Sequence, residues 1–358
     1  MARTVMLMVG TKKGVFLVES GEERLAWTVR GPFCDGFEIR DVTFDPSDGA
    51  ILAAASSPWF GAAVFRSEDL GKTWTHSSAG LTYGDDGPKL TRVWNVTAAH
   101  GRLYAGVEPA GLFRSDDRGV TWSHVAGLRA HPSTPDWQPG NGGLICHTIV
   151  AHPEDPDRLW VGISSVGVFE TVDGGATWAT RNKGVRTDFI PGPPPEFGQC
   201  VHKFAMAAGQ PDTLYQQNHC GVYRSDDGGA AWTEITGALP TDFGFVIGAH
   251  PRDPDTAWVI PLTEPGDGRF VPDAKPAVWR TGDRGGTWQR QDHGLPESNA
   301  WLSILREAMG VDALAPAGVY FGTQSGEVWG SADEGETWAQ VADHLPSIAS
   351  VDVAVVER

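Results

Sequence analysis

Three histidines and one glutamate form the most promising reactive set in this chain. They are Glu108, His147, His202 and His219, and a shift of 55 residues carries His147 onto His202. Imidazole and carboxylate groups suit zinc, manganese or iron, so the four residues could hold a divalent metal, with Glu108 as a further ligand or base. Without a metal, the same histidines could serve as general acids and bases. A third interpretation makes them hydrogen-bonded polar residues that line a wet channel.

Several charged and aromatic side chains are placed to hold a ligand beside this set. Lys12, Arg40, Arg92, Trp94 and Glu264 are the predicted substrate contacts. The basic members could bind one carboxylate or phosphate locally. Apolar walls with a few convergent polar groups are typical of a ligand pocket. The aromatic candidates for such walls are Trp59, Phe60, Trp137, Phe189 and Phe197.

The elements that must position these residues are given by a repeat. Six segments share the pattern Ser/Thr-x-Asp-x-Gly-x-Thr-Trp, with Ala231 replacing the threonine in the fourth segment. The segments span residues 67–74, 115–122, 171–178, 225–232, 281–288 and 331–338. Their central aspartates are Asp69, Asp117, Asp173, Asp227, Asp283 and Asp333. Successive aspartates are 48 to 56 residues apart, a period that suits a four-stranded propeller blade.

The chemistry of the repeated segment is that of a tight hairpin turn. Its hydroxyl and carboxylate oxygens can accept hydrogen bonds from the N–H groups of the turn. The glycine supplies a backbone angle that a Cβ would oppose, and the tryptophan buries a large ring at the start of the next strand. We therefore interpret the six aspartates as structural.

Each unit reads as strand, Pro/Asp turn, strand, Gly loop, strand, Asp-containing turn and final strand. A seventh, degenerate unit begins at Val9 and lacks its first strand, and the apolar segment 347–357 is left over at the other end. If that segment fills the gap, the ring closes and exposed sheet edges disappear. The expected fold is all-β: a single seven-bladed β-propeller over residues 1–358, with four-stranded antiparallel blades and one composite blade made from both ends.

The repeated turns resemble those of the BNR/Asp-box superfamily, which includes sialidases, xyloglucanases, sortilin-type receptors and photosystem II assembly factors. The resemblance covers essentially the whole chain and implies the fold rather than one activity. Sialidases use an arginine triad, a tyrosine with a glutamate, and an aspartate. Arg40 and Arg92 could match two of the arginines, whereas Arg306 falls within an expected strand and the Phe/Tyr-Arg-Ile-Pro motif is absent.

Three functions from different classes follow. The leading one is a propeller that binds a small molecule or sugar at its channel mouth, with hydrolase-like or lyase-like chemistry at the histidines. The alternative is a protein-interaction scaffold or assembly factor without catalysis, for which the proline-rich loop 185–199 could dock a partner. The third is a sialidase-like glycosidase, for which Glu108 and Glu264 are the nominated carboxylate pair.

Charge and composition narrow the partners and the compartment. The net charge of −17 disfavours nucleic acid and anionic membrane surfaces, and no apolar stretch approaches the ~20 residues of a membrane helix. The four cysteines form no CxxC pair, which favours free thiols in the cytoplasm. Cys146 and Cys200 are expected to pack between blades rather than act as ligands.

Overall fold

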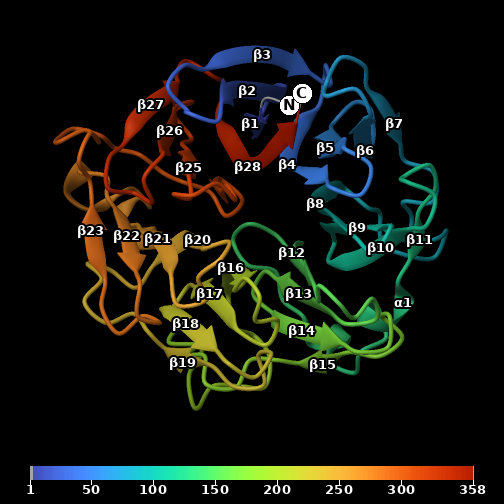
Figure 1. The fold of residues 1–358 in the computed structure, drawn as a ribbon. Coiled ribbons are helices and arrows are strands. Elements are labelled where there is room, and N and C mark those ends of the chain that lie inside the picture. Colours follow the sequence, from blue (N-terminus) through green and yellow to red (C-terminus); the bar gives the residue numbers. More distant parts are fainter. Residues whose placement is uncertain (1–2, 358) are drawn as a thin grey trace.

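The chain forms a ring of seven four-stranded antiparallel sheets around a central channel (Figure 1), which confirms the predicted fold class. A computed structural model describes residues 3–357, so residues 1, 2 and 358 of the predicted 1–358 domain lie outside the described part. Within residues 3–357, no helix has the length and apolar character needed to cross a membrane.

The strands follow one another from the channel outward in each blade. The composite blade contains β28 (Ile348–Glu357), β1 (Arg3–Thr11), β2 (Gly14–Gly21) and β3 (Thr28–Phe33). The second contains β4 (Glu38–Asp45), β5 (Ala50–Ser57), β6 (Gly61–Ser67) and β7 (Thr75–Ser77). The third contains β8 (Arg92–Ala99), β9 (Arg102–Glu108), β10 (Gly111–Ser115) and β11 (Ser123–His124). The fourth contains β12 (Cys146–Ala151), β13 (Leu159–Ile163), β14 (Gly167–Thr171) and β15 (Ala179–Thr180).

The remaining three blades repeat the same order. The fifth contains β16 (Val201–Met206), β17 (Leu214–Asn218), β18 (Val222–Ser225) and β19 (Thr233–Glu234). The sixth contains β20 (Gly244–Ala249), β21 (Ala257–Pro261), β22 (Val278–Thr281) and β23 (Gln289–Gln291). The seventh contains β24 (Met309–Val311), β25 (Val319–Gly322), β26 (Val328–Ser331) and β27 (Ala339–Ala342). Short helices interrupt the connections at α1 (Ala126–Arg129), η1 (Thr134–Asp136), η2 (Pro265–Asp267) and η3 (Pro272–Ala274).

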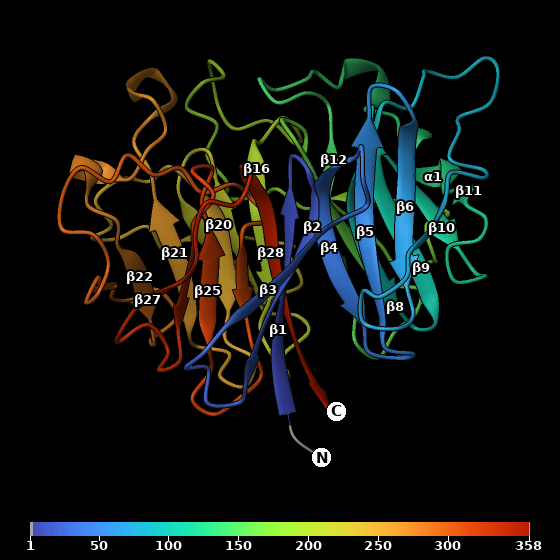
Figure 2. The same cartoon turned by 90° about the horizontal axis from the view of Figure 1, so that it is seen from above.

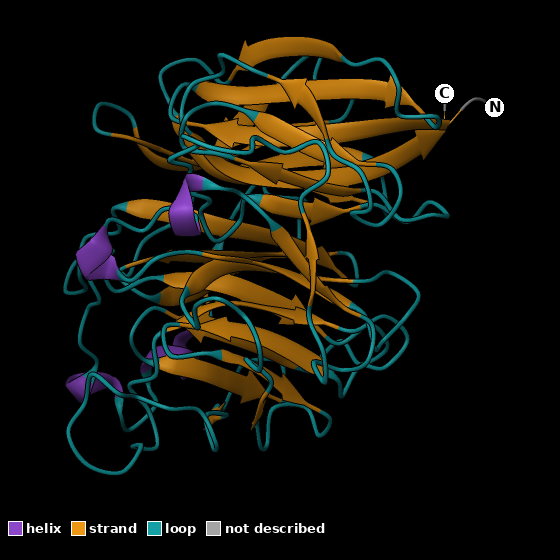
Figure 3. Cartoon of the chain, turned by 90° about the vertical axis from the view of Figure 1, so that its left-hand side faces the viewer, coloured by secondary structure: helices purple, strands orange, loops and turns teal. Residues whose placement is uncertain are grey.

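The predicted closure of the ring by the C-terminal segment is confirmed. Strand β28 pairs antiparallel with β1 over almost its whole length, from Arg3 opposite Glu357 to Thr11 opposite Ile348. Viewed along the channel, β28 is the innermost strand of the composite blade (Figure 1). The two chain ends lie at one end of the ring, and the helix-bearing connections rise from the other (Figures 2 and 3).

The Asp-containing turns hold themselves together through local hydrogen bonds. In the turn 171–178, the Thr171 hydroxyl donates to Asp173 Oδ1 at 2.7 Å and the Thr177 amide donates to the same oxygen at 2.9 Å. The Thr177 hydroxyl donates to Asp173 Oδ2 at 2.6 Å. Gly175 has a φ of 96°, a conformation that favours glycine. The hydrogen bonds from Thr177 lower the pKa of Asp173 to about 2.

We expect Asp173→Asn to lower the melting temperature at pH 7 but not near pH 2. A carboxyl whose pKa is depressed in the folded state contributes stability above its unfolded value of about 3.9, and this contribution is lost as the pH falls through the folded value. Melting curves of both proteins between pH 2 and pH 7 test this. Asp85→Asn is the control, because the exposed Asp85 makes no hydrogen bond or ion pair among residues 3–357. Equal destabilisation by both variants would contradict the prediction.

Candidate functional site

Bulges at the start of four consecutive inner strands place side chains at the channel mouth. The ladder between the first and second strand of each blade is irregular around one residue in β4, β8, β12 and β16. The residues at these irregularities are Arg40, Trp94, His147 and His202. A β-bulge redirects side chains and is common beside functional sites. These four residues therefore occupy equivalent positions in four consecutive blades.

Two adjoining cavities occupy the channel mouth. The large cavity, of about 840 Å³, is lined among others by Lys12, Glu38, Arg40, Trp59, Trp94 and Arg306. The thiol cavity, of about 480 Å³, is lined among others by Ser165, Cys200, His202, His219, Arg269 and Arg306. Arg306 belongs to both, so a ligand in either cavity could reach its guanidinium group.

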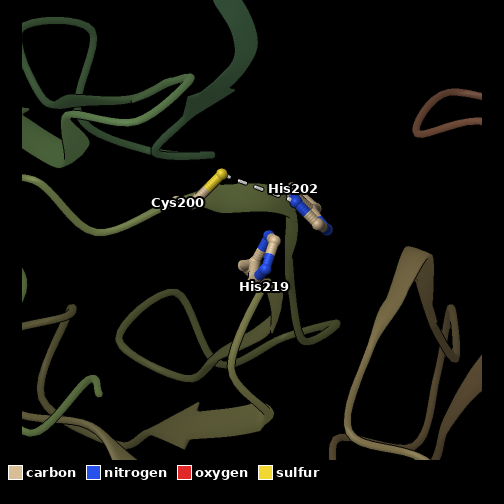
Figure 4. A group of neighbouring side chains, drawn as sticks. All are labelled: Cys200, His202 and His219. Atoms are coloured by element: carbon tan, nitrogen blue, oxygen red, sulfur yellow. Dashed lines mark hydrogen bonds between the residues drawn. The ribbon is translucent and has the colours of Figure 1, made fainter. Parts of the chain in front are cut away.

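Cys200, His202 and His219 converge in the thiol cavity (Figure 4). Cys200 immediately precedes β16, His202 lies in β16, and His219 follows β17. Their potential ligand atoms all lie within 4.8 Å of one another. The Cys200 Sγ is 3.6 Å from His202 Nε2, and the Ser165 hydroxyl donates to this sulfur at 3.4 Å. The arrangement is a compact thiol–imidazole cluster open to the cavity.

The neighbouring blade fixes the tautomer of His202. Its ring is 2% exposed, and Nδ1 donates to the Gly244 carbonyl at 2.5 Å. A carbonyl oxygen only accepts, so the Nε2 atom that faces Cys200 carries a lone pair when the ring is neutral. Burial, reinforced by the charge of Arg306, lowers the pKa of His202 to about 3. His202 is therefore a neutral base or ligand at physiological pH.

Opposing influences act on the Cys200 thiol. Burial by itself raises the pKa of this group, but the hydrogen bonds from His219 and Ser165 and the charge of Arg306 outweigh it. The net pKa lies below the usual value for cysteine, which favours the thiolate. Cys146, by contrast, is fully buried in a hydrophobic cluster as predicted, and its burial raises the pKa of the thiol to about 12.

His147 requires a correction to the predicted reactive set. Its ring is fully buried, with Nε2 donating to the Val201 carbonyl at 3.1 Å and Nδ1 accepting from the Thr148 hydroxyl at 2.8 Å. Both ring nitrogens are therefore used, and the residue ties the fourth blade to the fifth. Burial holds the pKa of His147 well below its usual value.

Glu108 and two of the predicted substrate contacts also lie apart from the two cavities. Glu108 forms an ion pair with Arg92 at 2.8 Å, and neither side chain lines the large cavity or the thiol cavity. Glu264 is likewise absent from both linings, and burial, together with Asp242, raises the pKa of its carboxyl. Of the predicted contacts, Lys12, Arg40 and Trp94 do line the large cavity.

Apart from Phe60, the aromatic residues predicted to wall one ligand pocket are distributed over three cavities. Trp59 lines the large cavity with 85% of its surface exposed, and Phe189 lines the thiol cavity. Trp137, Phe197 and Phe189 border a third cavity of about 410 Å³. Phe60 is 69% exposed and stacks on Phe37, a residue of the large cavity.

Arg306 is the main functional candidate that sequence reasoning missed. The expected strand around it is wrong: Leu302 and Ile304 alternate with less buried residues as in a strand, but the segment joins no sheet before β24. Arg306 forms no ion pair and its Nε has no hydrogen-bond partner among residues 3–357. Its guanidinium carbon lies 5.3 Å from the centre of the Phe245 ring. Burial lowers the pKa of Arg306, yet a guanidinium remains charged.

A buried charge cluster lies in the channel next to these residues. The Lys203 ammonium group contacts the carboxylate of Glu307, whose side chain is only 3% exposed. Asp41 accepts hydrogen bonds from Asn95 Nδ2 at 2.7 Å and from the Val96 amide at 3.1 Å. Burial raises the pKa of Asp41 to about 6, and it also raises the pKa of Asp352.

Comparisons with known proteins agree with the repeat and the architecture. The BNR-Asp box repeat model matches residues 64–77 and 112–125. A xyloglucanase of Paenibacillus sp. is 28% identical over 225 residues; the match covers 56% of this chain and about a fifth (21%) of the xyloglucanase. The GH74 enzyme of Niastella koreensis has a TM-score of 0.55 at 16% identity, covering 96% of this chain and 67% of that one. The structure of YCF48 bound to D1 peptide has a TM-score of 0.57 at 16% identity. The match covers 87% of this chain and 85% of the YCF48 chain.

At these identities the solved structures establish the fold alone. The matched repeats coincide with the first two of the six Asp-containing turns. The order of the strands in the sheets shows seven blades and a ring closed by the C-terminal strand β28. The chain is thus a seven-bladed β-propeller, and two of its Asp-containing turns match the BNR-Asp box repeat.

Proposed function

We propose that this propeller binds a small anionic molecule at its channel mouth and acts on it with the thiol–imidazole cluster. The observation that carries the proposal is Arg306, a guanidinium group that borders both cavities without a carboxylate partner among residues 3–357. An unpaired charge in a low-dielectric site is costly, and a bound carboxylate or phosphate would offset that cost with two parallel hydrogen bonds.

Two further arginines support an anion rather than a cation as the ligand. The positive charges of Arg269 and Arg40 both lower the pKa of Arg306. Arg40 pairs with Glu38 at 2.8 Å and lies over the Trp94 ring at 4.8 Å, while its Nε has no hydrogen-bond partner within the described residues 3–357. The chain as a whole carries a charge of −17, so this is a local concentration of positive charge in an acidic molecule.

The hydrolase-like or lyase-like reaction expected from the sequence is assigned to Cys200, His202 and His219. A reducing compartment such as the cytoplasm suits them, because the thiol must stay free. A glycosidase like the xyloglucanase relative would need two carboxylates flanking the ligand. Glu38 and Glu307 line the large cavity but are paired with Arg40 and Lys203, which supports this alternative less well.

A second candidate function is docking of a protein segment on the same face. The observation that favours it is the exposure of Trp59 and Phe60, at 85% and 69%, beside the large cavity. Exposed aromatic residues at a pocket rim are typical anchors for a partner. YCF48, a propeller of the same architecture, is known with a bound peptide. A carboxylate on such a segment could also reach Arg306.

The test is calorimetric titration of the purified chain with inorganic phosphate and with glucuronate. We expect at least one of these probes to bind, and Arg306→Gln to weaken that binding by about 10- to 100-fold, the effect of losing charged hydrogen bonds. Arg290→Gln is the matched control, since Arg290 lies in the outermost strand β23 and pairs with Asp292 at 2.7 Å.

Two results would contradict the proposal. One is that neither probe binds the wild-type chain, and the other is that Arg306→Gln and Arg290→Gln bind the probe as well as wild type. A partner protein that co-purifies in stoichiometric amount, and is lost in Trp59→Ala but not in Arg306→Gln, would assign the face to docking instead.

A further inference from the structure

One pair of atoms in the thiol–imidazole cluster has the spacing of two ligands on a metal ion. Two ligands on a tetrahedral zinc ion, with bonds of about 2.3 Å to sulfur and about 2.0–2.1 Å to nitrogen, lie about 3.6 Å apart. The Cys200 Sγ and His202 Nε2 are separated by 3.6 Å. The third ligand atom, from His219, lies within 4.8 Å of both. Small rotations of the half-buried His219 side chain would complete the set.

The outer contacts of His202 are those of a metal ligand. Metal-bound histidines usually donate their other N–H to a carbonyl or carboxylate, which fixes the ring and its tautomer. His202 does this through Nδ1, which donates to the Gly244 carbonyl and leaves the Nε2 lone pair facing the sulfur. The Cys200 thiol carries a single proton and can therefore donate a hydrogen bond to only one of the two imidazole rings, His202 or His219. A bound cation would contact all three ligand atoms at once.

The equivalent residue of the preceding blade, His147, differs from His202 in the contacts of its second ring nitrogen. His147 occupies the same bulge position in β12 and reaches the same kind of carbonyl, that of Val201. Its second nitrogen is taken by Thr148, and it belongs to no group of potential ligands among residues 3–357. The two rings therefore differ in what they offer: His202 Nε2 faces the Cys200 sulfur at 3.6 Å, whereas both ring nitrogens of His147 contact groups outside the thiol–imidazole cluster.

We propose that Cys200, His202 and His219 bind one zinc-class divalent ion, and that the open fourth position faces Arg306 and takes an oxygen of the anionic ligand. A thiolate with two imidazoles favours zinc over manganese among the metals considered from the sequence. One thiolate leaves a divalent ion with a net positive charge beside Arg306, which the ligand's negative charge would balance. The anion half of this inference rests on the proposed function, whereas the metal half does not.

The experiment is titration of the chelator-treated full chain with zinc and with cobalt. We expect one ion per chain and, with cobalt, a thiolate-to-metal charge-transfer absorption. Cys200→Ser and His219→Ala should each weaken zinc binding at least as much as the roughly 10- to 100-fold that outer-shell changes cost. Cys34→Ser is the control, because Cys34 is a buried thiol packed in another cluster. Thermal melts establish that each variant is folded.

Absence of saturable zinc binding, or equal binding by Cys200→Ser and Cys34→Ser, would overturn the metal site. If metal is absent but phosphate or glucuronate binds through Arg306, the proposed function stands and this inference falls. If metal binds and neither anion does, the proposed function falls while the metal half stands. If both bind, addition of the tighter anion should change the cobalt spectrum in wild type and not in Arg306→Gln; an unchanged wild-type spectrum would overturn the shared site.

Discussion

A chain that ends at Ser347 should not form a stable monomeric propeller. The truncation removes β28, whose Ile348, Val351 and Val356 are almost fully buried. Each such side chain contributes about 1.5–3 kcal/mol when buried, and the net stability of a whole domain is only about 5–15 kcal/mol. The loss also exposes the edge of β1 and opens the ring between β24 and β4, which both pack on β28.

The measurement is the soluble yield, oligomeric state and thermal melt of the truncated chain beside the full chain. A synthetic peptide of residues 348–357, added during refolding, is the positive control and should restore cooperative unfolding by reoccupying the place beside β1. A truncated chain that is monomeric and melts like the full chain would show that closure by β28 contributes little.

Replacing Lys203 by methionine should destabilise the fold by about 3–5 kcal/mol, the usual cost of leaving a buried charge without its partner. Lys203 contacts the buried carboxylate of Glu307 and acts electrostatically on Asp41 and Asp352. Methionine fills a similar volume, so the effect would report the charge rather than a cavity. Chemical denaturation of both proteins gives the free energy of unfolding.

The pH dependence of this loss distinguishes charge from packing. Asp41 has a pKa of about 6 in the fold, raised by burial from an unfolded value near 3.8. The contribution of Asp41 to stability is fully present when the pH is below its pKa in the unfolded chain. This contribution is lost as the pH rises to about 6, the pKa of Asp41 in the fold. Without Lys203 the carboxylates are less well compensated, so the destabilisation should be larger at pH 8 than at pH 4.5. Lys183→Met, at an exposed position, is the control and should show no such dependence.

The charge cluster around Lys203 and the thiol–imidazole cluster lie next to each other in the channel. Lys203 and Glu307 form an ion pair, whereas the residues that precede them, His202 and Arg306, line the thiol cavity. His202 and Lys203 are consecutive, as are Arg306 and Glu307, so each pair divides these tasks between neighbouring residues. Mutations in the charge cluster should therefore disturb the proposed site indirectly, and binding data on them need a parallel stability measurement.

The candidate site was only partly predictable. The sequence predicts His202 and His219 as members of the reactive set and Cys200 as packed between blades, whereas all three side chains line the thiol cavity. The Cys-x-His spacing of Cys200 and His202 is the signal for this pair that the sequence carries. The alignment with His202 predicts His147 as a member of the reactive set, but its ring nitrogens bond to the carbonyl of Val201 and the hydroxyl of Thr148. The sequence places Arg306 within an expected strand, which makes it a poor match to a sialidase arginine.

By itself the sequence determined the repeat, the number of blades and the closing strand. These follow from local rules: turns such as 171–178 are stabilised within eight residues, and alternating apolar residues specify the strands between them. Only the tertiary structure decided which side chains meet. The carbonyls that orient His147 and His202 belong to the neighbouring blades, 54 and 42 residues away along the chain. Hydrogen bonds over such separations leave no local pattern in the sequence, so the choice of reactive groups became visible only in the closed ring.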